Sequence, residues 1–319
     1  VRNLPSTLNI SGGGETALRY PMETISLEGK MGGVDSGFVS QSFYALDLML
    51  LRVMGVCFTY EKGKMVKSHY YPEIPGMPQP IVDTKGLEQE EFRKFVSLTR
   101  LQGEMRRAQE IIEKFGLDVC FLDGSIILHP ADKPNSDSKL WGEYQKTIRA
   151  CIELYESAEK HGGLLIGAIE DSRATRISEL LHHQFPNHPV ISKGLGKEMQ
   201  DAPLLDKVLH AGERSMAFAI AGDVKKHPIL MDFPEKWATR MYASYVKPSQ
   251  WDYPLRIEFL SGEKGEEITR IANRAAGYAF AQSRLHKEYA FPSVLIEADL
   301  RAGLKPEEVE LVSDKIFSK

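Results

Sequence analysis

The sequence predicts an elaborated α/β domain in which buried strands alternate with amphipathic helices. Apolar side chains recur every three or four residues over 87–115, which is typical of one helix stripe. The next segment, 119–128, is almost continuously apolar, as expected for a strand buried on both faces. A second such run, "GGLLIGAIEDS" (162–172), precedes a predicted helix near 173–184. The chain of 319 residues is long enough to bury a sizeable core.

Bulk composition narrows the class of protein. Hydrophobic residues make up 42% and charged residues 26%, values typical of a globular protein, and the net charge of −4 gives no global basic signature. No apolar run approaches about 18 residues, so we expect no membrane-spanning helix, and no secretory signal is apparent. The cysteines Cys57, Cys120 and Cys151 lack metal-site spacing and indicate reduced thiols in a cytoplasmic protein.

The first half of the chain contains several predicted elements. "MGGVDSGFVS" is expected to be a strand that enters a turn at Asp35. A hairpin should follow, because four polar residues over 61–64, one of them glycine, separate two β-rich runs. The helix over 87–115 should end at Gly116, and a further helix is expected over about 138–160.

The later half is expected to contribute the remaining elements. Strands are predicted over 240–246 and 253–260, and helices over 266–287, 293–304 and 306–317. No internal repeat or linker is apparent. We therefore predict one domain over 1–319, with a core of about 30–184 and 254–305 and an insertion or subdomain over about 185–262.

Two aspartates stand beside small residues. Asp35 precedes Ser36-Gly37, and Asp123, inside an apolar run, precedes Gly124-Ser125. A buried carboxylate is costly unless it is paired or bound to a metal, and small neighbours let a metal or phosphate approach the backbone. The structural alternative for each is a turn or cap aspartate.

The helix between these aspartates supplies a third acid. At about 100° per residue, Glu104 lies at the edge of the apolar stripe, whereas Glu110 lies on its far, solvated side. Glu104 is therefore a candidate to face the sheet. The alternative is a surface glutamate paired with Arg100 or Arg107.

Together the three acids predict a cation site. Two carboxylates about 4 Å apart repel by roughly 4 kcal/mol at an effective dielectric constant near 20. Oxygen ligands favour Mg²⁺ or Mn²⁺ over zinc, and such ions support phosphodiester hydrolysis. An aspartyl phosphatase is the enzymatic alternative raised by "FLDGS", but Ser125 stands where that chemistry wants a second acid.

Three blocks of the sequence resemble the NurA nuclease family. "MGGVDSGF" with the following hairpin resembles its first motif, and "RLQGEMRRAQEIIEKFGLDVCFLDGSI" resembles its second block, an Arg-x-x-x-Glu helix that runs into a Leu-Asp-Gly-Ser strand. "EYAFPSVLIEADLRAGL" resembles the C-terminal block. The order and spacing of these blocks cover the chain from about 32 to 304.

The resemblance implies a fold, an activity and partners. It implies an RNase H-like (Piwi-like) mixed sheet flanked by helices. It also implies a Mn²⁺-dependent DNA nuclease with 5′–3′ exonuclease and single-strand endonuclease activity, using two ions, with Mg²⁺ as the alternative metal. It further implies a homodimer that works with the HerA hexameric helicase–translocase in DNA end resection.

The resemblance also assigns residues. Asp35, Glu104 and Asp123 match the family's metal-binding acids, and Tyr289 matches its C-terminal tyrosine. Asp299 stands where the family usually has a histidine, and as a carboxylate it is able to ligate Mn²⁺. This departure leaves a second possibility, a catalytically weak or inactive DNA-binding ring subunit that docks on the helicase.

Other candidates carry structural alternatives. Glu170 and Asp171 follow a predicted strand, where a further acid or a helix-start residue is expected. The hairpin lysines and Lys225-Lys226 are expected to be solvated unless DNA crosses them. Four aromatic residues are candidate stacking surfaces, with core packing as the alternative: Phe218, Tyr242, Tyr245 and Trp251.

Overall fold

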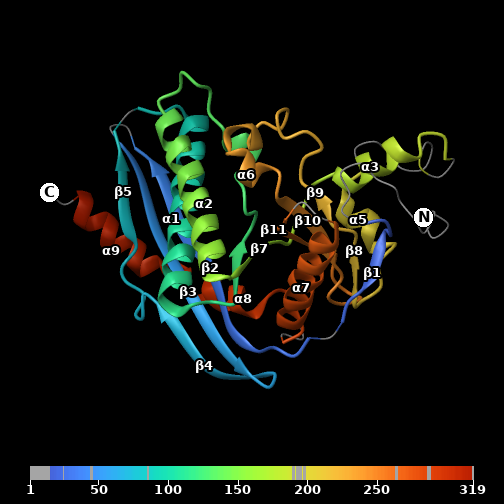
Figure 1. Cartoon of the computed structure of the whole chain (residues 1–319). Helices are drawn as coiled ribbons and strands as arrows, with labels where there is room; N and C mark the ends of the chain where they lie inside the picture. Colours follow the sequence, from blue (N-terminus) through green and yellow to red (C-terminus); the bar gives the residue numbers. More distant parts are fainter. Residues whose placement is uncertain are drawn as a thin grey trace. The chain divides into compact units, whose positions relative to one another are not determined.

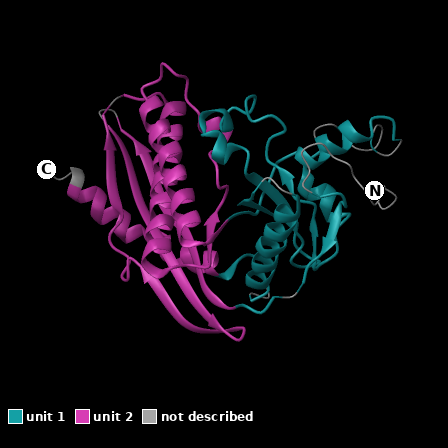
Figure 2. Ribbon diagram, viewed as in Figure 1, with its two compact units in different colours: residues 1–27, 166–293 teal, residues 28–165, 294–319 magenta. Residues whose placement is uncertain are grey.

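The chain folds into two units that share a boundary inside one strand and one helix. The computed structural model describes residues 15–23, 25–43, 46–84, 86–188, 191, 196, 199–262, 265–285 and 289–317 (Figure 1). Unit 1 comprises residues 1–27 and 166–293, and unit 2 comprises residues 28–165 and 294–319 (Figure 2). That they act as the one nuclease domain predicted from the sequence stays a prediction.

The sheet of unit 2 is mixed. Strands β2 (Gly29–Ser42), β3 (Asp47–Glu61) and β4 (Lys64–Tyr71) are antiparallel, and β5 (Gln79–Asp83) pairs with the remaining edge of β3. Strand β6 (Val119–Asp123) runs parallel to β2 on its other edge. Three antiparallel strands, a helix and a strand parallel to the first confirm the predicted RNase H-like mixed sheet.

Helices cover both faces of this sheet. The helices of unit 2 are α1 (Gln89–Phe115), α2 (Trp141–His161), α8 (Ser293–Ala302) and α9 (Pro306–Phe317), with a short 3₁₀ turn η1 (Pro130–Asp132). A Cβ at Gly32 would meet side chains at the end of α1, whereas a Cβ at Gly33 would lie 2.8 Å from the carbonyl oxygen of Val294 in α8. Because successive strand residues point to opposite faces, α1 and α8 cover opposite sides of β2.

The turn predicted at Asp35 is wrong. Strand β2 continues through Asp35 to Ser42 and pairs with β3 along its whole length. Gly37 explains the misleading signal: a Cβ there would collide with the backbone carbonyl of Ala302 in α8. The glycine serves the close approach of a helix to a strand and does not mark a turn.

Replacing Gly37 by alanine is expected to destabilise unit 2 and displace the end of α8. The added methyl group meets helix backbone, which cannot move aside as a side chain can, so we expect a loss of about 2 kcal/mol in the free energy of unfolding. Urea unfolding measures this change. Gly142→Ala in α2 is the control, because nothing lies within 4 Å of its Cβ position. That variant should gain stability.

Strand β6 is shorter than predicted. It ends at Asp123 and not near residue 128, because Gly124 turns the chain with a φ of 114°. Ile126 and Leu128 are still buried, although they lie outside the strand. The carbonyl of Ile126 accepts a hydrogen bond from Tyr155 of α2. Burial in a covered loop thus produced the apolar pattern that predicted a longer strand.

Most other predicted elements of unit 2 are confirmed. Helix α1 ends at Gly116, whose N–H donates to the carbonyl of Ile112. The hairpin turns at Lys62 and Gly63, both with positive φ, as a two-residue type I′ connection requires. The three cysteines are free and buried.

Unit 1 contains a largely antiparallel sheet with the strand order β1-β8-β10-β11-β7. The strands are β1 (Arg19–Pro21), β7 (Leu164–Ile169), β8 (Glu213–Ser215), β9 (Phe218–Ala219), β10 (Met241–Val246) and β11 (Leu255–Leu260). The helical elements are α3 (Arg176–Gln184), α5 (Asp201–Asp206), η2 (Leu230–Asp232), α6 (Glu235–Ala238) and α7 (Gly265–Ser283). The strands predicted over 240–246 and 253–260 are confirmed; α7 ends before 287, and residues 286–288 lie outside the described part.

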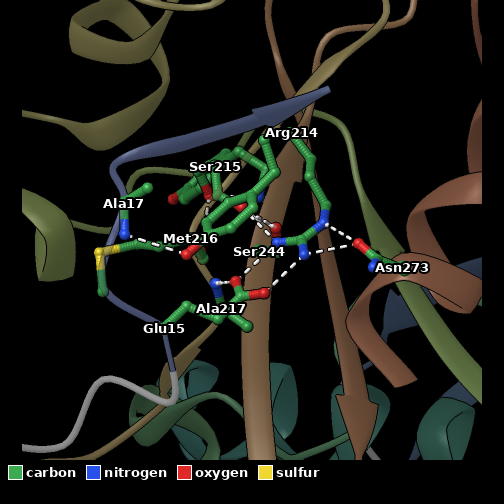
Figure 3. A network of polar contacts seen from close by, with 10 residues as sticks. Glu15, Ala17, Arg214, Ser215, Met216, Ala217, Ser244 and Asn273 are labelled. Atoms are coloured by element: carbon green, nitrogen blue, oxygen red, sulfur yellow. Dashed lines mark hydrogen bonds and ion pairs between the residues drawn. The ribbon is translucent and has the colours of Figure 1, made fainter. Parts of the chain in front are cut away.

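A buried ion pair fixes the start of the described chain to unit 1 (Figure 3). The two terminal guanidinium nitrogens of Arg214, Nη1 and Nη2, donate to Glu15 at 2.6 Å, and the backbone N–H of Ala217 donates to the same carboxylate. Arg214 also donates to Asn273 of α7 and lies over the ring of Tyr20. The side chains of Glu15 and Arg214 are 1% and 0% exposed, so neither charge has access to water.

Among the described residues, no helix is both long and apolar enough to cross a membrane.

Candidate active site

Asp35 lies in the middle of β2 on the face that α8 covers. Gly33, Asp35 and Gly37 alternate along the strand, and α8 backbone lies against both glycines. Asp35 is only 5% exposed. The two glycines thus bring α8 close to the strand at the level of the acid.

Two further aspartates approach Asp35. The parallel register pairs Val34 with Leu122, so Asp123, the last residue of β6, stands beside Asp35 and points to the same face. Asp299 of α8 is exposed, and its charge acts on the nearby Asp35 carboxyl. The structure thus brings Asp123 and Asp299 beside Asp35, and the predicted gathering of Asp35, Glu104 and Asp123 around a metal stays a prediction.

The electrostatics of Asp35 follow from this crowding. Burial and the charges of Asp123 and Asp299 together raise the pKa of Asp35 to about 7, against a hydrogen bond from the Ser36 N–H that lowers it. A cation bound beside these acids would relieve their mutual repulsion.

Glu104 reaches the same strand from the opposite face. It projects from α1, is 4% exposed, and accepts hydrogen bonds from Ser36 Oγ and from Arg100 at 3.0 Å. Burial and the charge of Asp35 raise the pKa of Glu104 while Arg100 and Ser36 lower it, which leaves it at about 7. The pairing with Arg100 is found, but Glu104 is buried and faces the sheet, so it is not the surface glutamate of the alternative interpretation. Arg107 instead pairs with Glu110.

In this structure the acids do not form a complete metal-binding site. In the described part of the chain, no three or more His, Cys, Asp and Glu side chains are gathered closely enough to hold a metal ion. The donor set still fits a hard divalent ion, because it consists of carboxylates whose mutual repulsion a bound cation would relieve. Their roles as metal ligands stay predictions.

Tyr289 belongs to unit 1, whereas the acids Asp35, Glu104, Asp123 and Asp299 belong to unit 2. Its hydroxyl donates to Glu170, which directly follows β7, and its ring stacks on Phe291. Sequence reasoning named both Tyr289 and Glu170 but did not pair them. The predicted role of Tyr289 beside the metal site stays a prediction.

Sequence reasoning missed Ser36 as the partner of Glu104. The strand period of two was the available signal, since Ser36 must face away from Asp35. Among the proposed stacking residues, Phe218, Tyr242 and Tyr245 are buried, so core packing is confirmed for them. Trp251 is 86% exposed.

The chain superposes on the crystal structure of the NurA nuclease from Sulfolobus solfataricus with a TM-score of 0.55 and 12% identity, covering 94% of this chain and 88% of that one. A structure of NurA with manganese matches with a TM-score of 0.51 and 10% identity over 94% and 90% of the two chains. At these identities the likeness shows the fold alone. No protein of curated function matches the sequence.

The family assignment rests on the sequence. The model of the NurA domain matches residues 29–302. The match includes β2, α1, β6 and α8, the four elements that carry Asp35, Glu104, Asp123 and Asp299. Because it spans most of the chain, the protein belongs to the NurA family.

Proposed function

We propose that this chain is a metal-dependent DNA nuclease that hydrolyses phosphodiester bonds with Mn²⁺, or with Mg²⁺ as the alternative ion. The observation that carries the proposal is the close approach of Asp35, Asp123 and Asp299. Burial and these neighbouring charges raise the pKa of Asp35 to about 7, so a bound cation would stabilise its ionised form. The NurA structure solved with manganese supports the choice of metal.

The residues take separate roles in this proposal. Asp35 and Asp123 would hold the ions, and Glu104 and Asp299 would complete the ligand set. Two such ions would supply an activated water and stabilise the leaving oxygen. Asp299 offers an anionic oxygen where the family usually has an imidazole, which favours hard ions such as Mn²⁺ and Mg²⁺. Tyr289 is assigned a supporting role from the C-terminal block.

The finer assignments come from the family resemblance. They are 5′–3′ exonuclease and single-strand endonuclease activity, action in DNA end resection in the cytoplasm, a homodimer, and a HerA-type hexameric helicase–translocase as partner. The test incubates the purified chain with labelled single-stranded and duplex DNA in Mn²⁺, in Mg²⁺ and in EDTA, with and without that translocase. Mn²⁺-dependent cleavage supports the proposal, and labels at the 5′ and 3′ ends give the polarity.

A second candidate is a ring subunit that binds DNA and docks on the translocase without cutting. Asp299 favours it, because a carboxylate cannot act as a neutral imidazole. DNA that remains intact in every divalent ion, even with the translocase present, would replace the nuclease proposal with this one.

Single-strand binding offers a separate prediction at Trp251. This residue and Tyr253, which is 63% exposed, project from the loop between β10 and β11. Ser249 Oγ accepts hydrogen bonds from backbone N–H groups of this loop, and Lys247 donates to a backbone carbonyl in it, so the loop is held in place. Stacking on a base contributes about 1–3 kcal/mol, so Trp251→Ala should weaken binding of oligothymidine in EDTA about tenfold. Fluorescence anisotropy measures it. Met231→Ala, which removes another exposed apolar side chain of unit 1, should bind as wild type does.

A further inference from the structure

Glu104 and Asp35 belong to one predicted site but approach it from different faces of the sheet. Asp35 shares its face with α8, while the next residue, Ser36, faces α1 and meets Glu104. Strand β6 ends at Asp123, level with Asp35, and β2 continues beyond it without β6 at its edge. Glu104 thus meets β2 at Ser36, one residue beyond the level at which β6 ends.

The contacts of Glu104 are distributed unevenly between its two oxygens. Ser36 Oγ and Arg100 Nη1 both donate to Oε1. Among the described residues, no hydrogen bond to Oε2 is found. Two donors on one oxygen restrict rotation of the carboxylate and leave the second oxygen available to a ligand.

We propose that Ser36 and Arg100 are positioning residues that together fix Glu104 through Oε1 and leave Oε2 to ligate a divalent ion. This inference rests on the proposed nuclease function. Neither residue needs to touch the metal or the DNA. Both act by orienting a ligand, as hydrogen-bond partners of metal ligands do in other sites.

The pair also balances charge at a buried carboxylate. Glu104 lies on a helix flank from which water is nearly excluded, and Arg100, with 30% of its side chain exposed, supplies the positive charge that favours the ionised form. Ser36 contributes direction, because its hydroxyl is fixed on the rigid strand that also carries Asp35. A flexible surface glutamate would have to be ordered by the metal at an entropic cost, whereas this one is ordered beforehand.

The experiment measures Mn²⁺ binding directly, by the electron paramagnetic resonance signal of free Mn²⁺, on the full chain without DNA. Ser36→Ala and Arg100→Gln should each raise the dissociation constant for Mn²⁺ about tenfold, as loss of outer-shell partners commonly does. Ser36→Thr keeps the hydroxyl, and Arg100→Lys keeps the charge. Both should restore most of the affinity.

A matched control separates positioning from a general effect on α1. Lys94→Gln removes another ion pair of that helix, with Glu90, away from Glu104. It should bind Mn²⁺ as wild type does. Melting temperatures without metal, recorded for every variant, show whether a loss of binding reflects a loss of folding.

Two outcomes would overturn the inference, and they differ from failure of the proposed function. Wild-type Mn²⁺ affinity in folded Ser36→Ala and Arg100→Gln proteins would show that Glu104 needs neither residue. Equal loss in Ser36→Ala and Ser36→Thr would show that the hydroxyl is not the cause. Wild-type protein that binds no Mn²⁺ would instead remove the metal site, and the proposed function with it.

Discussion

Asp35→Asn is expected to abolish Mn²⁺-dependent cleavage and, in the same protein, to stabilise the metal-free fold at pH 8. Metal-ion stabilisation of the transition state contributes several kcal/mol, and each 1.4 kcal/mol is a factor of ten. We therefore expect a loss of about a thousandfold or more in the cleavage rate. An amide retains the shape of the carboxyl group but offers the ion no negative charge.

The stabilising effect follows from the pKa of the same group. Burial and neighbouring acids raise the pKa of Asp35 from 3.8 to about 7, so the folded protein favours the protonated form. Between about pH 4 and pH 7 the native state binds more protons than the unfolded chain, and stability falls as pH rises. Above the folded pKa the loss is complete, on the order of 4 kcal/mol. Glu104, with a pKa also near 7, changes stability in the same direction.

Urea unfolding in EDTA at pH 4.5, 6 and 8 checks this expectation. The difference between Asp35→Asn and wild type should be small at pH 4.5, where both side chains are neutral, and largest at pH 8. Glu110→Gln, which changes a carboxylate on the solvated side of α1, should leave cleavage and the pH dependence unchanged. An Asp35→Asn protein that cuts DNA at the wild-type rate would refute the assignment of Asp35.

Glu15→Gln should be among the most destabilising single changes in unit 1. It leaves the guanidinium of Arg214 buried without a counter-charge, and removing one partner of such a pair costs about 3–5 kcal/mol. Urea unfolding should show this loss. Glu143→Gln, which breaks a pair between exposed Lys146 and half-buried Glu143 on α2, should change stability by less than about 1 kcal/mol.

The double variant Glu15→Leu/Arg214→Met tests the physical reason. Removing both charges also removes the uncompensated one, so the double variant should be more stable than Glu15→Gln alone. A double variant as unstable as the sum of both single changes would show that the packing of the two side chains, and not the buried charge, is what matters.

Local chemistry made much of the fold predictable. The apolar stripe of α1, its end at Gly116 and the two-residue hairpin turn at Lys62 and Gly63 depend on neighbours a few residues away. The three distant acids were recognised because carboxylates in apolar or stripe-edge positions require a partner. The lengths of β2 and β6 were not predicted correctly. A glycine occurs both at turns and where a helix approaches a strand closely, so the sequence does not show which of the two it marks.

The sequence by itself determined which elements form and which acids are candidates, because helix and strand periods and turn residues act over short distances. Only the tertiary structure decided which faces these acids share. It placed Asp299 against Asp35 through two glycines that admit α8, and it placed Glu104 on the opposite face beside Ser36. The physical reason is that the covering of a strand face depends on helices far away along the chain, whose approach is set by backbone contact and burial.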